Sequence, residues 1–220
     1  MSMKRRASGL ASSIAQIALL TWTLASVPCT VAAGEVIDRV LAVASGNLIL
    51  LSDVSAAREF GIVAPVAEGD PVREVLSRLI ERALVLAEVD RYSPAEPAAA
   101  AVDQSLGVVR ARFADAESFV AALARSGIHE THLREMLRSE LRIRAYLDQR
   151  FTVPIPADDD LDAFYRNHSA EFTRGGQLMP FAEVRQEVID ASTSERRRTL
   201  VTDWIADLRR RADVLDLYSK

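Results

Sequence analysis

The sequence of 220 residues has little cysteine, glycine or proline: it contains one cysteine, 9 glycines and 8 prolines. A single cysteine excludes a disulfide framework, and so few glycines and prolines exclude a collagen-like chain. The net charge is -4, whereas domains that bind nucleic acid are usually basic, so no nucleic-acid partner is expected. The 49% of hydrophobic and 26% of charged residues exclude a disordered chain and indicate an ordinary globular protein.

The sequence also lacks the P-loop, the dinucleotide fingerprint and the Gly-x-Ser-x-Gly motif, so we predict no catalytic residue and no cofactor. His129 and His132 are three residues apart, whereas a zinc-binding helix places its histidines four apart and needs a third ligand. The polar start of a helix is the favoured interpretation. The aspartates at 158–160 favour a helix N-terminus over a cation site, and the arginines at 196–198 favour a solvated helix face over a lipid contact. No metal site is predicted.

Residues 1–33 have the layout of a secretory signal peptide, with Lys4, Arg5 and Arg6 ahead of an apolar run at 14–27. The run is too short to cross about 30 Å of hydrocarbon, so cleavage after Ala33 is favoured over a retained anchor. A lipid-modified Cys29 and twin-arginine export are disfavoured. We therefore expect a periplasmic protein without cysteine, with a net charge of about -7 and no stable membrane insertion.

The order of apolar and turn residues predicts a mainly α fold. A hairpin is expected from residues 36–43 and 48–51, and a strand from 214–218, which together form a small sheet. Helices are expected after an N-cap at Ser52, over 71–92, over 102–113, after an N-cap at Asp115, over 129–151, from 158 and from 181, with a capping-box spacing at Ser192 and Glu195. A glycine-containing loop is expected at 173–180.

The order of these parts resembles the SurA, PpiD and PrsA group of exported parvulin-type foldases and chaperones. Four stretches carry the resemblance: 36–43 with 47–54, 76–86, 133–168, and 180–214. It implies a SurA N-terminal-like helical module over residues 34–172, completed by a helix and strand over 181–220. In the family an isomerase domain lies between these parts, whereas only residues 173–180 are available here, and a folded domain needs about 50 residues. The resemblance therefore implies the chaperone module without its catalytic insert.

The helix expected at 129–151 carries the candidate client-contact face: Met136, Glu140, Ile143, Arg144 and Leu147. Glu140 and Arg144 fall inside its apolar arc, as either a partly buried structural pair or part of a surface that meets a partner. Met136 is either core filler or part of an adaptable contact surface. The resemblance implies a chaperone-like protein that binds unfolded or extended outer-membrane or secreted polypeptides. Residual prolyl isomerase activity and a module for one dedicated partner are the alternatives, and the oligomeric state is left open.

Overall fold

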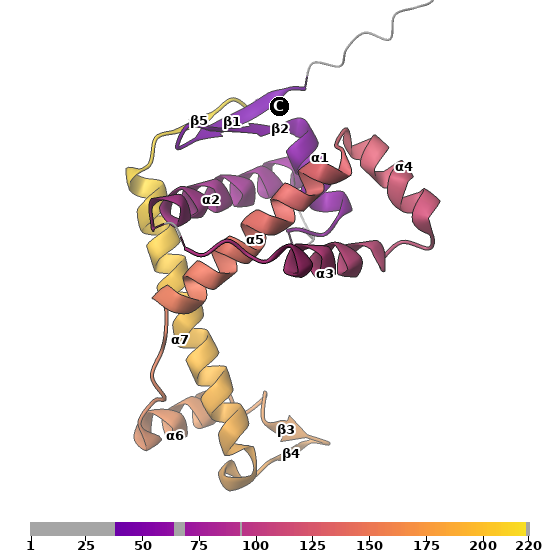
Figure 1. Ribbon diagram of the computed structural model, residues 1–220. Coiled ribbons are helices and arrows are strands. Elements are labelled where there is room, and N and C mark those ends of the chain that lie inside the picture. Colours follow the sequence, from indigo (N-terminus) through magenta and orange to yellow (C-terminus); the bar gives the residue numbers. More distant parts are fainter. Residues whose placement is uncertain (1–37, 64–68, 93, 219–220) are drawn as a thin grey trace, which may run out of the picture. The chain divides into compact units, whose positions relative to one another are not determined.

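The computed structural model describes residues 38–63, 69–92 and 94–218, and the predicted export segment at 1–33 lies outside them (Figure 1). The strands are β1 (Val40–Ala44), β2 (Asn47–Leu50), β3 (Thr173–Arg174), β4 (Gln177–Leu178) and β5 (Val214–Asp216). The helices are α1 (Leu51–Glu59), α2 (Pro71–Tyr92), α3 (Ala99–Arg110), α4 (Ala116–Ser126), α5 (Glu130–Arg150), α6 (Asp158–Asn167) and α7 (Phe181–Arg211). The predicted mainly α fold is confirmed.

The larger sheet joins the first strands of the described chain to the last, as predicted. Its order is β2-β1-β5, and both pairings are antiparallel. Ser45 and Gly46 form the two-residue turn between β1 and β2, and both have positive φ angles, 48° and 81°. Such angles match the twist of the flanking strands, which explains why the hairpin closes here. Figure 1 shows the yellow β5 beside the indigo hairpin.

Two adjoining clusters of buried side chains form the core around this sheet. The first joins the inward face of the sheet to α2, the C-terminal half of α5 and the C-terminal end of α7. The second joins α1, α3, α4 and the N-terminal half of α5, with Phe60 at its centre in ring contact with Phe113 and Phe119. Met136 of α5 packs against both clusters, so this helix connects them.

A third cluster lies between α6, the β3–β4 hairpin and the N-terminal part of α7. Its buried members are Leu161, Phe172, Val184, Val188 and Ile189. The hydroxyl of Tyr165 donates a hydrogen bond to the carbonyl of Met179 at 2.5 Å, which fixes α6 to the segment after the hairpin.

Several predicted helix ends are confirmed by their cap geometry. The carboxylate of Asp70 accepts hydrogen bonds from the N–H groups of Val72 and Arg73 at 3.0 and 3.3 Å, at the start of α2. Asp115 accepts a bond from the N–H of Ser118 at 2.7 Å at the start of α4. These bonds satisfy donors that the first turn of a helix leaves without a helical partner.

Three sequence predictions about local structure were wrong. Ser52 is not an N-cap, because α1 already begins at Leu51 and the Ser52 hydroxyl donates to the carboxylate of Asp38. Residues 173–180 are not a plain loop, because Gly175 and Gly176 both take positive φ angles and close the β3–β4 hairpin. The capping-box spacing at Ser192 starts no helix. Ser192 is buried in the middle of α7, which has neither glycine nor proline to interrupt it.

None of the helices within the described ranges combines the length and the apolar character needed to span a membrane.

Candidate functional site

The predicted client-contact face of α5 is divided among the core and two surface grooves. Ile143 is 8% exposed and belongs to the first core cluster, and Leu147 packs against the same cluster. These two residues are therefore structural. The other three, Met136, Glu140 and Arg144, line grooves on different sides of the helix.

Met136 lines a cavity of about 250 Å³, here named the β2 groove. Four elements form it: β2, α2 and α5 contribute most of the lining, and α1 contributes Asp53. Its lining consists of Asn47, Leu48, Ile49, Asp53, Leu79, Arg82, Ala83, Leu86, His132, Glu135, Met136 and Ser139. Most of the side chains from α2 are apolar, whereas α5 contributes polar groups beside Met136. Such a lining suits an apolar ligand whose orientation is set by a few polar contacts.

Glu140 and Arg144 line a second cavity, of about 280 Å³, between α3, α5 and the segment after α1. Among the described residues no ion pair joins them, so the interpretation of Glu140 and Arg144 as a pair is wrong, and the alternative of a contact surface is left open. Glu140 instead pairs with Arg82 of α2, whose guanidinium also donates a hydrogen bond to the carbonyl of Met136 at 2.6 Å. The spacing along α5 could not predict this partner, because Arg82 belongs to another helix, α2, which packs against α5.

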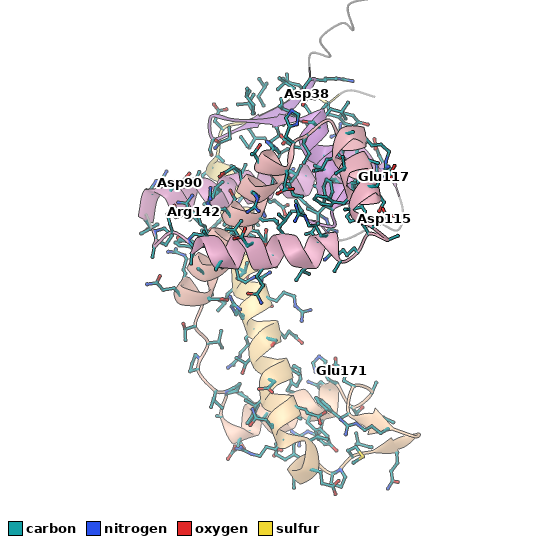
Figure 2. All side chains as sticks on the ribbon, turned by 45° about the vertical axis from the view of Figure 1, so that its right-hand side comes forward. Asp38, Asp90, Asp115, Glu117, Arg142 and Glu171 are labelled. Atoms are coloured by element: carbon teal, nitrogen blue, oxygen red, sulfur yellow. The ribbon has the colours of Figure 1, made fainter. Side chains whose placement is uncertain are left out.

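The Arg82–Glu140 pair separates the two grooves, since Arg82 lines the first and Glu140 the second. The Arg82 side chain is 16% exposed, and its burial lowers the pKa of the guanidinium to about 10. Arg82 is therefore still charged near neutral pH. Arg142, two residues beyond Glu140 in α5, also links this helix to α2, through Asp90 at 2.8 Å (Figure 2).

His132 occupies one end of the β2 groove. Its Nε2 lies 2.8 Å from the carboxylate of Asp53, which comes from α1. The hydrogen bond to Asp53 raises the pKa of His132 above its usual value, and the nearby charges of Asp38 and Glu135 act in the same direction. The sequence identified His132 only as part of a polar helix start. Its pairing with Asp53 could not be predicted, because the two residues are 79 positions apart.

The largest of these cavities, about 610 Å³, lies between α6 and α7. The ring of Phe164 stacks on His168 with centroids 4.0 Å apart, and His168 Nε2 lies 3.5 Å from Glu195. Asp160 and Arg196 face each other at 3.4 Å across the same cavity. The aspartates at 158–160 and the arginines at 196–198, considered separately in the sequence, thus include members of one ion pair.

Several polar side chains in these cavities have partners within the described part of the chain. In the α6–α7 cavity, His168 Nδ1 lies 3.0 Å from the carbonyl oxygen of Phe164, and Nε2 faces Glu195. Among the described residues no three histidine, cysteine, aspartate or glutamate side chains are grouped so that they could hold a metal ion. No protein-family model matches the sequence, and no curated protein matches it.

Proposed function

We propose that this protein is exported to the periplasm and binds extended apolar segments of unfolded polypeptides, as a chaperone-like protein without catalytic activity. The observation that carries the proposal is an apolar row on the outward side of the β2-β1-β5 sheet. Val43 is paired with Leu48 on one side and with Leu215 on the other. Directly paired residues of an antiparallel sheet place their side chains on the same face. These three residues define the outer sheet face.

The outer sheet face is directed away from the core. Ala42, Ala44 and Ile49 alternate with its members along β1 and β2 and are buried against α2. Leu48 is 60% exposed and Leu215 is 55% exposed. A sheet with one solvated face usually carries polar residues there, so an apolar row spanning all three strands is the pattern of a contact surface.

The strength of this surface suits reversible binding. Complete burial of a leucine side chain is worth about 1.5–3 kcal/mol, and roughly half of each leucine remains to be buried. The row can therefore contribute only a few kcal/mol, which corresponds to affinities weaker than about micromolar. A polypeptide held this weakly is released without ATP. In the family that the sequence resembles, an isomerase domain would be expected between α6 and α7, where this chain has a short β3–β4 hairpin, and its lack there supports holding as the main task.

An aggregation assay with an unfolded outer-membrane protein tests the proposal. The protein, purified after export, is expected to suppress light scattering by the client at stoichiometric ratios. The variant Leu48→Ser/Leu215→Ser is expected to lose most of this effect. Ile155→Ser/Leu178→Ser, which changes two exposed apolar residues outside this sheet, is the matched control. Absence of suppression by the unaltered protein, or equal suppression by the outer-sheet-face variant, would overturn the proposal. The mass of the exported protein tests the predicted cleavage after Ala33.

A further inference from the structure

Strand β2 is an edge strand of the sheet, and the pairing register shows which of its backbone groups face outward. Ala44 and Asn47 flank the two-residue turn and therefore form a hydrogen-bonded pair, whereas Val43 and Leu48 form the next, non-hydrogen-bonded pair. The N–H and C=O of Leu48 consequently point away from β1, towards the open edge. Two residues further along the strand, the N–H of Leu50 also points away from β1. It donates a hydrogen bond to the Asp53 carboxylate at 2.8 Å.

The open edge of β2 is therefore short and has a defined end. The N–H of Leu50 already donates to the Asp53 carboxylate, and helix α1 begins at Leu51. Within the described ranges, Leu48 is left with one backbone donor and one backbone acceptor that are directed outward and have no hydrogen-bond partner. The backbone of an added strand offers a carbonyl and an N–H with the spacing that satisfies both groups at once.

Each side of this edge presents apolar side chains. Leu48 and Val43 lie on the outer sheet face, and Ile49 lies on the opposite side with Leu86 and Met136 in the β2 groove. A strand placed beside β2 would direct alternate side chains to the two sides. It could thus bury apolar residues on both of its faces.

The charges of the β2 groove favour an uncharged occupant. Arg82 pairs with Glu140, and Asp53 pairs with His132. The other acid of the groove, Glu135, pairs with Arg138 at 2.5 Å. The ionised side chains that line the groove are therefore already matched, and a charged ligand group would have to break one of these pairs.

The size of the edge distinguishes a polypeptide segment from a second copy of this chain. A stable protein interface buries about 800 Å² on each partner and involves about 20–30 residues a side. One hydrogen-bonding residue, a few apolar side chains and a groove of about 250 Å³ offer much less than that. A contact surface of this size suits a single extended strand a few residues long.

We propose that β2 accepts an uncharged, extended client segment as an added strand, with its backbone bonded to Leu48 and its alternate side chains in the β2 groove and on the outer sheet face. This inference rests on the proposed function and specifies how the client is held. It defines the client as a segment that is apolar on both faces of its strand. Binding by edge addition also covers a backbone that would otherwise pair with another client.

A pair of variants isolates the backbone contribution. Leu48→Ala shortens the side chain and keeps the N–H, whereas Leu48→Pro removes the N–H that faces the open edge and leaves the β1–β2 hydrogen bonds in place. The probe is a fluorescent peptide with eight central valine and leucine residues, measured by anisotropy. The Leu48→Pro variant is expected to bind about tenfold more weakly than Leu48→Ala, since a hydrogen-bonding position is lost. Equal affinities of the two variants would overturn the inference.

A modified peptide and hydrogen exchange provide measurements that do not depend on a variant. N-methylation of all eight central amides keeps the side chains but prevents strand pairing, and is expected to weaken binding to the unaltered protein at least tenfold. The amide of Leu48 is expected to exchange at least tenfold more slowly with the unmethylated peptide bound. Binding that survives methylation and leaves this amide unprotected would overturn edge addition but leave the proposed function standing. Absence of both peptide binding and aggregation suppression would overturn both.

Discussion

Removing the charge of Glu140 tests whether this residue is structural or part of a client surface. The pair with Arg82 connects α5 to α2, and Arg82 also holds the carbonyl of Met136. In Glu140→Gln the half-buried guanidinium of Arg82 loses its counter-charge but keeps this hydrogen bond. We therefore expect the substitution to lower the free energy of unfolding.

The exposure of the two side chains sets the size of the effect. Breaking a fully buried ion pair costs about 3–5 kcal/mol, whereas exposed pairs are worth about 0–1 kcal/mol. Arg82 is 16% exposed but Glu140 is 37% exposed, so solvent screens part of the interaction. We expect a loss of about 1–2 kcal/mol, which lowers the Tm by about 2–8 °C in a chain of this length.

A double-mutant cycle measured by urea unfolding separates the pair from its surroundings. Arg82→Met removes the cation, so adding Glu140→Gln to it is expected to cost little, and the coupling free energy should be about 1–2 kcal/mol. Arg144→Gln is the control, because this exposed side chain lies one turn from Glu140 and should change stability by less than about 0.5 kcal/mol. A coupling below about 0.5 kcal/mol, or an equal loss in Arg144→Gln, would refute a structural pair.

Three further substitutions test the fold and its pH dependence. Because Asp53 raises the pKa of His132 above 6.5, this contact stabilises the protein fully below pH 6.5 and is lost as the pH rises through the raised pKa. In His132→Gln, the fall in thermal stability as the pH rises through this range should be smaller. An unchanged dependence of the Tm on pH would contradict the assignment. Gly127→Ala places a side chain at a φ of 72°, with the nearest contact at an ordinary 3.7 Å, so urea unfolding should show a loss of about 1–2 kcal/mol from the backbone alone. Leu133→Ala should cost about 2–5 kcal/mol in the same assay because Leu133 is 0% exposed, whereas Val120→Ala, at 61% exposed, should cost less than about 0.5 kcal/mol, and similar losses would refute this burial.

The sequence predicted the elements whose signals are local. Asp70 and Pro71 correctly mark the start of α2, and Asp115 marks that of α4, because caps and fixed φ angles act within one turn. The terminal sheet was also predictable from its β-branched runs. A local signal failed at Ser192, where a capping spacing had no chain break to accompany it and the helix continued.

The candidate site was only partly predictable, because its geometry depends on contacts between distant residues. The apolar arc of α5 correctly marks a face that packs, but it does not show that Ile143 goes to the core while Met136 lines a groove. The sequence pattern predicts for Leu48 only that it belongs to a strand. Its value as a contact residue depends on the register with Val43, which fixes both its face and its outward backbone groups.

The pairing of β1 with β5 has a consequence for the order of folding. The central strand pairs with a strand that lies far along the chain, since Ala42 is paired with Asp216. The sheet therefore remains incomplete until β5 has been made, and contacts between such distant positions form slowly.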